Sequence, residues 1–192
     1  MSGLDPLACG GFLLVAFVLA GTAQTAWFAS PASGRFAQPL DGGVSLRGRR
    51  LFGENKTRRG FVVMVPATAI SFALLAMLAG DPAVLGLWRL SLPGYALAGA
   101  VAGFGFMAGE LPNSFVKRQL DIAPGDATRG QLASACQFAV DRLDSGIGML
   151  LALSLLVAVP WRTAALVLIV GPFIHWTFSV VMFRLGLKPR PA

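Results

Sequence analysis

Five long stretches of apolar residues divide the chain, and the polar residues gather between them. The stretches cover residues 7–29, 60–80, 90–109, 145–161 and 163–183. Each approaches the length of about 20 residues that an α-helix needs to cross about 30 Å of hydrocarbon. Because backbone polar groups inside a bilayer must be satisfied within the segment itself, we expect helices rather than strands. The pattern predicts an all-α integral membrane protein with about five transmembrane helices, forming a single domain over residues 1–192.

The composition agrees with this prediction. Of the 192 residues, 55% are hydrophobic and only 13% are charged, which is too apolar for a water-soluble domain of this size. No basic residue precedes the first stretch, which is also longer than the apolar core of a signal peptide, about 7–15 residues, so we expect it to stay in the mature protein. Cys9 and Cys136 match no metal-ligand spacing, and we expect both to be small buried residues.

The basic residues lie mostly on one side of the predicted membrane. Seven fall between the first two stretches, four between the third and fourth, and three in the tail, whereas only Arg89 and Arg162 fall on the other side. The positive-inside rule then predicts an extracellular N-terminus, a cytoplasmic C-terminus and cytoplasmic motif loops at about 30–59 and 110–144. The 14 residues on the basic side are Arg35, Arg47, Arg49, Arg50, Lys56, Arg58, Arg59, Lys117, Arg118, Arg129, Arg142, Arg184, Lys188 and Arg190.

Small residues recur at a spacing of four in the third stretch. Gly99 and Gly103 form one pair, and Gly105 and Gly109 form a second. This spacing lets helix backbones approach closely. The glycines therefore predict a helix-packing face.

Acidic residues concentrate on the same side as the basic ones. Asp141 and Asp144 are three apart, so their carboxylates share one side of a helix. Mg²⁺ typically takes one or two protein carboxylates and completes its shell with water and phosphate oxygens. The pair therefore predicts a Mg²⁺ site, with the hydroxyl of Ser145 as a further ligand or a helix cap. The alternative is an interfacial helix end with solvated acids, in which Arg142 pairs with lipid phosphate. Residues 109–148 hold five of the nine acids, namely Glu110, Asp121, Asp126, Asp141 and Asp144.

Two basic clusters flank this acidic segment in the predicted topology. One follows the third stretch and the other precedes the second, so both could converge on a polyanion; the alternative is anchoring at lipid headgroups. We expect anchoring for Arg47, Arg49 and Arg50. For Lys56 and Lys117 we expect a directed phosphate site, because hydroxyl, amide or Gly positions stand beside them. The clusters are Lys56, Arg58 and Arg59, and Lys117 and Arg118 with Ser114 before them.

Basic groups beside a carboxylate pair describe a site for a metal-bound phosphoryl compound. An opening toward lipid describes a second, amphipathic substrate. Together they favour nucleotidyl or phosphoryl transfer. We expect His175, in the fifth stretch, to be a packed, hydrogen-bonded helix residue remote from both motifs.

Three motifs resemble those of a known family. "GENKTRRG" resembles the G-x-x-KTxRG element, and "GELPNSFVKRQL" the G-D-x-x-x-S-F-x-KR element, of the CDP-archaeol synthases, which are similar to the phosphatidate cytidylyltransferases. "DRLDS" is similar to the end of the signature in the latter group. The specific match covers about residues 51–60 and 109–145. Glu110 stands where the archaeol-type pattern has Asp, and the Lys-Asp and His-Gly-Gly middle of the phosphatidate signature is missing.

The resemblance implies a Mg²⁺-dependent transfer of CMP from CTP to a membrane lipid phosphate, archaetidic or phosphatidic acid, with release of pyrophosphate. It implies that Asp141 and Asp144 hold the metal, with Glu110 as a further metal or orienting ligand. It assigns phosphate binding and catalysis to Lys117. The remaining substrate-binding residues that it implies are Lys56, Thr57, Arg59, Gly60, Ser114 and Arg118.

Two other functions compete with this one. A CDP-alcohol phosphotransferase requires the DGxxAR…GxxxDxxxD pattern, whereas Asp41-Gly42 is followed by "GVSL" and no such acid array. A non-enzymatic carrier or anionic-lipid-binding protein would place its charges at the interface and bind no nucleotide with Mg²⁺. We expect no nucleic-acid partner. The sequence leaves open a homo-oligomeric assembly, the ether or ester linkage of the lipid, and a preference for CTP or dCTP.

Overall fold

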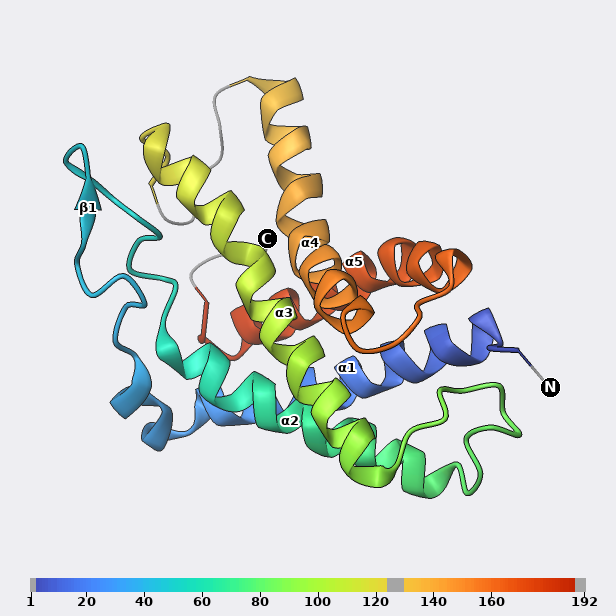
Figure 1. Ribbon diagram of the computed structural model, residues 1–192. Coiled ribbons are helices and arrows are strands. Elements are labelled where there is room, and N and C mark those ends of the chain that lie inside the picture. Colours follow the sequence, from blue (N-terminus) through green and yellow to red (C-terminus); the bar gives the residue numbers. More distant parts are fainter. Residues whose placement is uncertain (1–2, 124–129, 189–192) are drawn as a thin grey trace.

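The computed structural model describes residues 3–123 and 130–188, which form five α-helices (Figure 1). Asp126, Arg129 and Arg190 lie outside these described residues. A short 3-10 helix, η1 (Pro31–Phe36), and a two-stranded hairpin, β1 (Ser45–Leu46) and β2 (Arg49–Arg50), lie between the first two helices. The helices are α1 (Pro6–Ala29), α2 (Arg58–Leu78), α3 (Leu92–Gln119), α4 (Gln131–Ser154) and α5 (Trp161–Arg184).

The prediction of an all-α membrane protein is confirmed. Within the described residues, α1, α2, α3 and α5 are long and apolar enough to cross a membrane. The helix α4 differs, because Asp141, Arg142 and Asp144 lie in its middle and only the part after them matches the predicted fourth stretch. The segment 110–144, expected to be a loop, is helical up to Gln119 and again from Gln131. The apolar stretches end where charges begin, but the backbone hydrogen bonding of α3 and α4 continues past that point.

Side-chain and proline caps fix the starts of two helices. The Asp5 carboxylate accepts hydrogen bonds from the backbone N–H groups of Leu7 and Ala8, at 2.8 and 3.0 Å, and Pro6 occupies the first turn. Ser91 caps α3 in the same way. These contacts satisfy N–H groups that have no partner within the helix.

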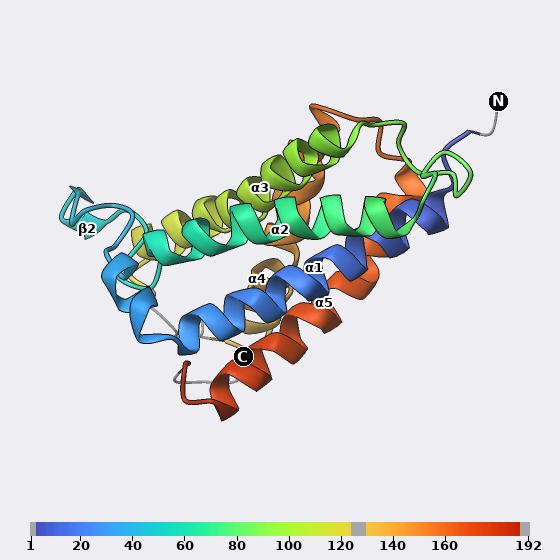
Figure 2. The same ribbon diagram turned by 90° about the horizontal axis from the view of Figure 1, so that it is seen from below.

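The helix α1 lies between α2 and α5, while α3 packs against both α2 and α4 (Figures 1 and 2). A Cβ at Gly10 would lie 2.6 Å from Leu166 Cδ2, and one at Gly21 would lie 2.8 Å from Phe178 Cε2. The contact points therefore move toward the C-terminus on both helices, so α1 and α5 run in the same direction. The C-terminal ends of α1 and α5 thus lie at the same end of the bundle.

The helix α3 uses its two glycine pairs on two different neighbours. A Cβ at Gly99 would lie 2.5 Å from the Thr68 carbonyl oxygen of α2. A Cβ at Gly109 would lie 2.9 Å from the Cα of Gly148 on α4. The predicted packing face is confirmed and is in fact two faces, since small residues let both backbones come into contact.

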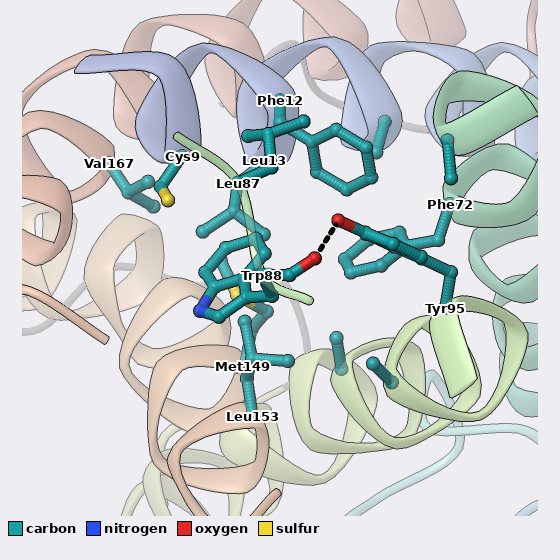
Figure 3. Close-up of a cluster of buried hydrophobic side chains, with 14 of the residues drawn as sticks. Cys9, Phe12, Leu13, Phe72, Leu87, Trp88, Tyr95, Met149, Leu153 and Val167 are labelled. Carbon is teal, nitrogen blue, oxygen red and sulfur yellow. Dashed lines mark hydrogen bonds between the residues drawn. The ribbon is translucent and has the colours of Figure 1, made fainter. Parts of the chain in front are cut away.

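A cluster of aromatic side chains fills the end of the bundle where α1 and α3 begin (Figure 3). The rings of Phe12 and Phe72 meet edge to face with centroids 5.1 Å apart. The Tyr95 hydroxyl donates to the Trp88 carbonyl oxygen at 2.6 Å, and the Trp88 indole donates to the Ala158 carbonyl oxygen at 2.8 Å. Both polar groups of the buried cluster are therefore satisfied.

The two cysteines differ in environment. Cys9 is buried in this aromatic cluster, as expected. Cys136 is exposed, so the prediction for it was wrong. It lies in the first half of α4, which extends away from the rest of the bundle (Figure 1).

Candidate functional site

A cavity of about 610 Å³ opens among the five helices and the segment that precedes α2. This volume lies within the range of about 300–1,000 Å³ that is typical of small-molecule sites. Six Lys or Arg residues and four carboxylate residues line it, together with many apolar side chains. All ten residues that the sequence analysis assigned to a site lie on its wall, namely Lys56, Thr57, Arg59, Gly60, Glu110, Ser114, Lys117, Arg118, Asp141 and Asp144. Arg58 is exposed and is not among the lining residues.

The two carboxylates of α4 both accept a hydrogen bond from the side chain of Asn113 on α3. The Asn113 amide nitrogen donates to Asp141 Oδ1 at 2.6 Å and to Asp144 Oδ2 at 2.9 Å. Lys117 Nζ donates to the same oxygen of Asp141 at 2.6 Å. The backbone N–H of Ser145 donates to the other oxygen of Asp144 at 2.6 Å. The acids therefore share one face of α4, and α3 supplies positive and amide groups directly opposite.

Glu110 joins the acid pair to the first motif. It forms an ion pair with Lys56 and accepts a hydrogen bond from the Ser145 hydroxyl at 2.9 Å. Burial lowers the pKa of Lys56, but the carboxylates of Glu110, Asp144 and Asp141 outweigh it and hold that pKa above its ordinary value. Lys56 is therefore a firmly charged ammonium inside the cavity.

A buried carboxylate organises the turn that precedes Lys56. Asp41 accepts hydrogen bonds from the backbone N–H groups of Gly43, Phe52 and Gly53, each at 3.1 Å, and forms an ion pair with Arg50. The Arg50 guanidinium and these backbone groups hold the pKa of Asp41 well below its usual range, despite its burial. These contacts order the segment and so fix the direction in which the backbone enters α2.

Two of the hairpin arginines, which were expected to anchor at lipid headgroups, form ion pairs within the protein. Arg50 is paired with Asp41, and Arg49 pairs with Asp121 and donates to the Gln119 carbonyl oxygen. The hairpin folds back onto the end of α3, so these side chains bind the protein itself, and their anchoring at lipid headgroups stays a prediction. The pairing joins the two motif segments outside the cavity.

Asn113 was missed by the sequence analysis. It lies three residues after Glu110 and four before Lys117, which is the spacing of one helical face. Interpreting "GELPNSFVKRQL" as helix instead of loop would have identified all three positions together.

His175 was also misplaced by the sequence analysis. It lines the same cavity as both motifs, and its ring lies 6.4 Å from that of Phe106. Its buried Nδ1 has no hydrogen-bond partner within the described residues. No local pattern in the fifth stretch could have shown this, because the proximity arises from packing between α5 and distant segments.

Two carboxylates of the cavity, those of Asp141 and Asp144, suit Mg²⁺ as ligands. Among residues 3–123 and 130–188, no group of three or more His, Cys, Asp and Glu side chains is arranged to hold a metal ion. Glu110 forms an ion pair with Lys56, and its role as a further metal or orienting ligand stays a prediction. Asp141 and Asp144 remain, and two carboxylates are what Mg²⁺ commonly takes where phosphate and water complete its shell.

Comparison with known proteins finds close relatives of this chain. The family model described as CarS-like CDP-archaeol synthase matches residues 12–191. The CDP-archaeol synthase of Halorubrum lacusprofundi is 34% identical over 162 residues, covering 80% of this chain and 83% of the relative. That of Methanopyrus kandleri is 33% identical over 159 residues, covering 80% and 79%. A solved structure described as an intramembrane enzyme for archaeal membrane lipids biosynthesis matches with a TM-score of 0.59 at 25% identity, covering 85% of this chain and 90% of its own.

Proposed function

The chain belongs to the CDP-archaeol synthase family, cytidylyltransferases that make a CDP-lipid for membrane lipid biosynthesis, and we propose that it transfers CMP from CTP to a lipid phosphate in this cavity. The products are the CDP-lipid and pyrophosphate. The observation that carries the proposal is the joining of Lys56, Lys117 and the acid pair in one cavity with apolar walls.

The reaction brings together two polyanions, and their repulsion is its main obstacle. A lipid phosphate oxygen must attack the α-phosphorus of CTP while negative charge builds up on the departing pyrophosphate. Fixed cations in a water-poor cavity stabilise such charge strongly, because they need no reorganisation during the reaction. The excess of basic over acidic lining residues suits this task.

Each motif then has a distinct proposed part. Asp141 and Asp144 would hold Mg²⁺, which supplies neutralisation of phosphate charge when bound. Asn113 and Ser145 orient the two carboxylates through the hydrogen bonds described above. The substrate phosphates would be bound on two walls, by Lys56, Thr57, Arg59 and Gly60 on one and by Ser114, Lys117 and Arg118 on the other.

No side chain of the cavity needs to act as a general base. A phosphate monoester is already largely ionised near neutral pH, since its second pKa is about 6. The chain's own residues therefore bind, screen and align the two phosphates. This matches a cavity rich in fixed cations and hydrogen-bond donors.

The lipid is proposed to be archaetidic acid, in keeping with the names of the relatives. The test offers the purified protein CTP and Mg²⁺ in detergent, with archaetidic acid and phosphatidic acid supplied separately, and measures pyrophosphate release. Release with archaetidic acid supports the proposal, and release with phosphatidic acid alone would change the lipid class. A folded preparation that releases none with either lipid would favour the carrier or lipid-binding alternative.

A further inference from the structure

The wall that α5 gives to the cavity carries two polar side chains on an otherwise apolar face. His175 and Ser179 are four residues apart and therefore point to the same side of the helix. The flanking lining residues from this helix are Ile174, Phe178 and Met182. Polar groups at these two positions, embedded among apolar ones, suit a ligand that is charged at one end and apolar at the other.

The chain reverses just after α5 and returns to this wall. Gly186 adopts a φ of +71°, its N–H donates to the Phe183 carbonyl oxygen at 2.9 Å, and the N–H of Leu187 donates to the Met182 carbonyl oxygen at 2.8 Å. These two bonds with a left-handed glycine form a Schellman turn. The turn directs Lys188 into the cavity, where its Nζ donates to Ser179 Oγ at 3.2 Å.

Lys188 differs from the other lysines of the cavity in its partner. The chain has three lysines, and all three line this cavity. Lys56 is paired with Glu110 and Lys117 with Asp141, whereas the hydrogen bond of Lys188 within the described residues is to a neutral hydroxyl. An ammonium in such a place needs an anion to offset the loss of water.

The electrostatics of Lys188 support the same conclusion. Burial lowers its pKa, and the positive charges of Lys56 and Arg142 lower it further, against the carboxylate of Glu110. The negative charge of a bound phosphate would oppose these effects and raise the pKa of Lys188. Because the charges of Glu110 and Lys56 act on Lys188, these three side chains lie near one another in the cavity.

We propose that Lys188, Ser179 and His175 form the binding site for the phosphate monoester of the lipid substrate. This assignment rests on the proposed function and adds the subsite for its second substrate. The apolar residues beside this binding site on α5 suit the start of the lipid chains. The acid pair with Lys117 lies on the side formed by α3 and α4 and suits a metal-bound nucleotide. His175 contributes Nδ1, which has no partner in the part of the chain that the structure describes, and Ser179 contributes a hydroxyl that also holds Lys188 in place.

The test separates the two substrates kinetically. For Lys188→Ala we expect the KM for lipid phosphate to rise about 10- to 100-fold, as for loss of a charged hydrogen bond, with the KM for CTP changed by less than about twofold. Lys188→Arg should recover part of the loss. Arg184→Ala is the matched control, because it removes an exposed cation from the same tail. Thermal unfolding in detergent establishes that each variant is folded, and Ser179→Ala, a smaller change, should raise the same KM to a lesser degree.

A second measurement does not depend on turnover. Binding of a short-chain lipid phosphate without CTP should weaken in Lys188→Ala and stay unchanged in Arg184→Ala. Equal lipid binding by the wild type and Lys188→Ala, or a rise confined to the KM for CTP, would overturn the inference. If the wild type binds lipid phosphate through Lys188 but forms no CDP-lipid, the proposed function is wrong and the assignment of the lipid-phosphate binding site is supported.

Discussion

The Cα of Gly109 on α3 faces the backbone of Asp144 on α4 so closely that any side chain at position 109 would meet the Asp144 carbonyl oxygen. This close approach sets the position of the acid pair relative to Glu110 and Asn113, which follow Gly109 by one and four residues on α3. A packing contact between two helices thereby fixes the geometry of the candidate site.

Gly109→Ala should displace α4 and disturb both stability and activity. Inserting a methyl group into a packed contact typically costs about 1–3 kcal/mol, and movement of the acid pair should lower CDP-lipid formation at least about tenfold. Thermal unfolding and product formation measure the two effects. Gly11→Ala is the control, because a Cβ there meets nothing within 4 Å. Equal behaviour of the two variants would show that the α3–α4 contact does not set the site.

Asn113→Ala should weaken metal binding without removing a metal ligand. Loss of the amide removes the one donor that joins the two carboxylates, so each keeps only its separate contact with Lys117 or the Ser145 N–H. Outer partners of metal ligands are typically worth about 10- to 100-fold in affinity or activity. We expect the Mg²⁺ concentration for half-maximal activity to rise by about that factor, measured by titration at saturating CTP. An unchanged titration curve would remove Asn113 from the site.

Asp41→Asn should destabilise the hairpin segment in a pH-dependent manner. The pKa of Asp41 is lower in the folded chain than the unfolded value of about 3.9. Its stabilising effect is therefore fully present above that unfolded value and is lost as the pH falls toward the folded pKa. Thermal unfolding should separate the wild type from Asp41→Asn at pH 7, and the gap should shrink below about pH 4. Asp81→Asn, in the connection between α2 and α3, serves as the control; a gap that is constant with pH would contradict the prediction.

The exposure of Cys136 offers a test of orientation. It lies just before Asp141 on α4, whereas Cys9 is buried in the aromatic cluster. If the cavity opens to the cytoplasm, as the basic residues predict, a membrane-impermeant maleimide should label the protein in inverted vesicles and not in intact cells. Cys136→Ser should abolish that labelling, since Cys9 is inaccessible. Labelling in intact cells would reverse the predicted topology.

The sequence predicted the parts of the site that follow from local spacing. Hydrophobic stretches of helical length located the helices, and the i, i+3 spacing of Asp141 and Asp144 placed both carboxylates on one face. The glycine spacing likewise predicted close packing of α3. Each of these inferences uses only residues within one element.

The parts it missed depend on how distant segments pack. Asn113 was overlooked because its segment was interpreted as loop, so the face it shares with Glu110 was not considered. His175 and Lys188 reach the cavity only because α5 packs against α1 and α4 and the tail turns back at Gly186. The pairing of Arg49 with Asp121 depends in the same way on where the hairpin folds.

The most direct test of the account compares wild type with Asp144→Asn in the conversion of labelled CTP and archaetidic acid into CDP-lipid, with Mg²⁺ and with a chelator. The substitution keeps the shape of the side chain and removes its charge, so thermal unfolding should show a folded protein. We expect Mg²⁺-dependent product from the wild type and a loss of at least about 1,000-fold in the variant, which corresponds to about 4 kcal/mol of transition-state stabilisation. Product formation by Asp144→Asn at the wild-type rate, or by the wild type with all divalent cations removed, would contradict the central claim that the acid pair of α4 holds the metal for CMP transfer.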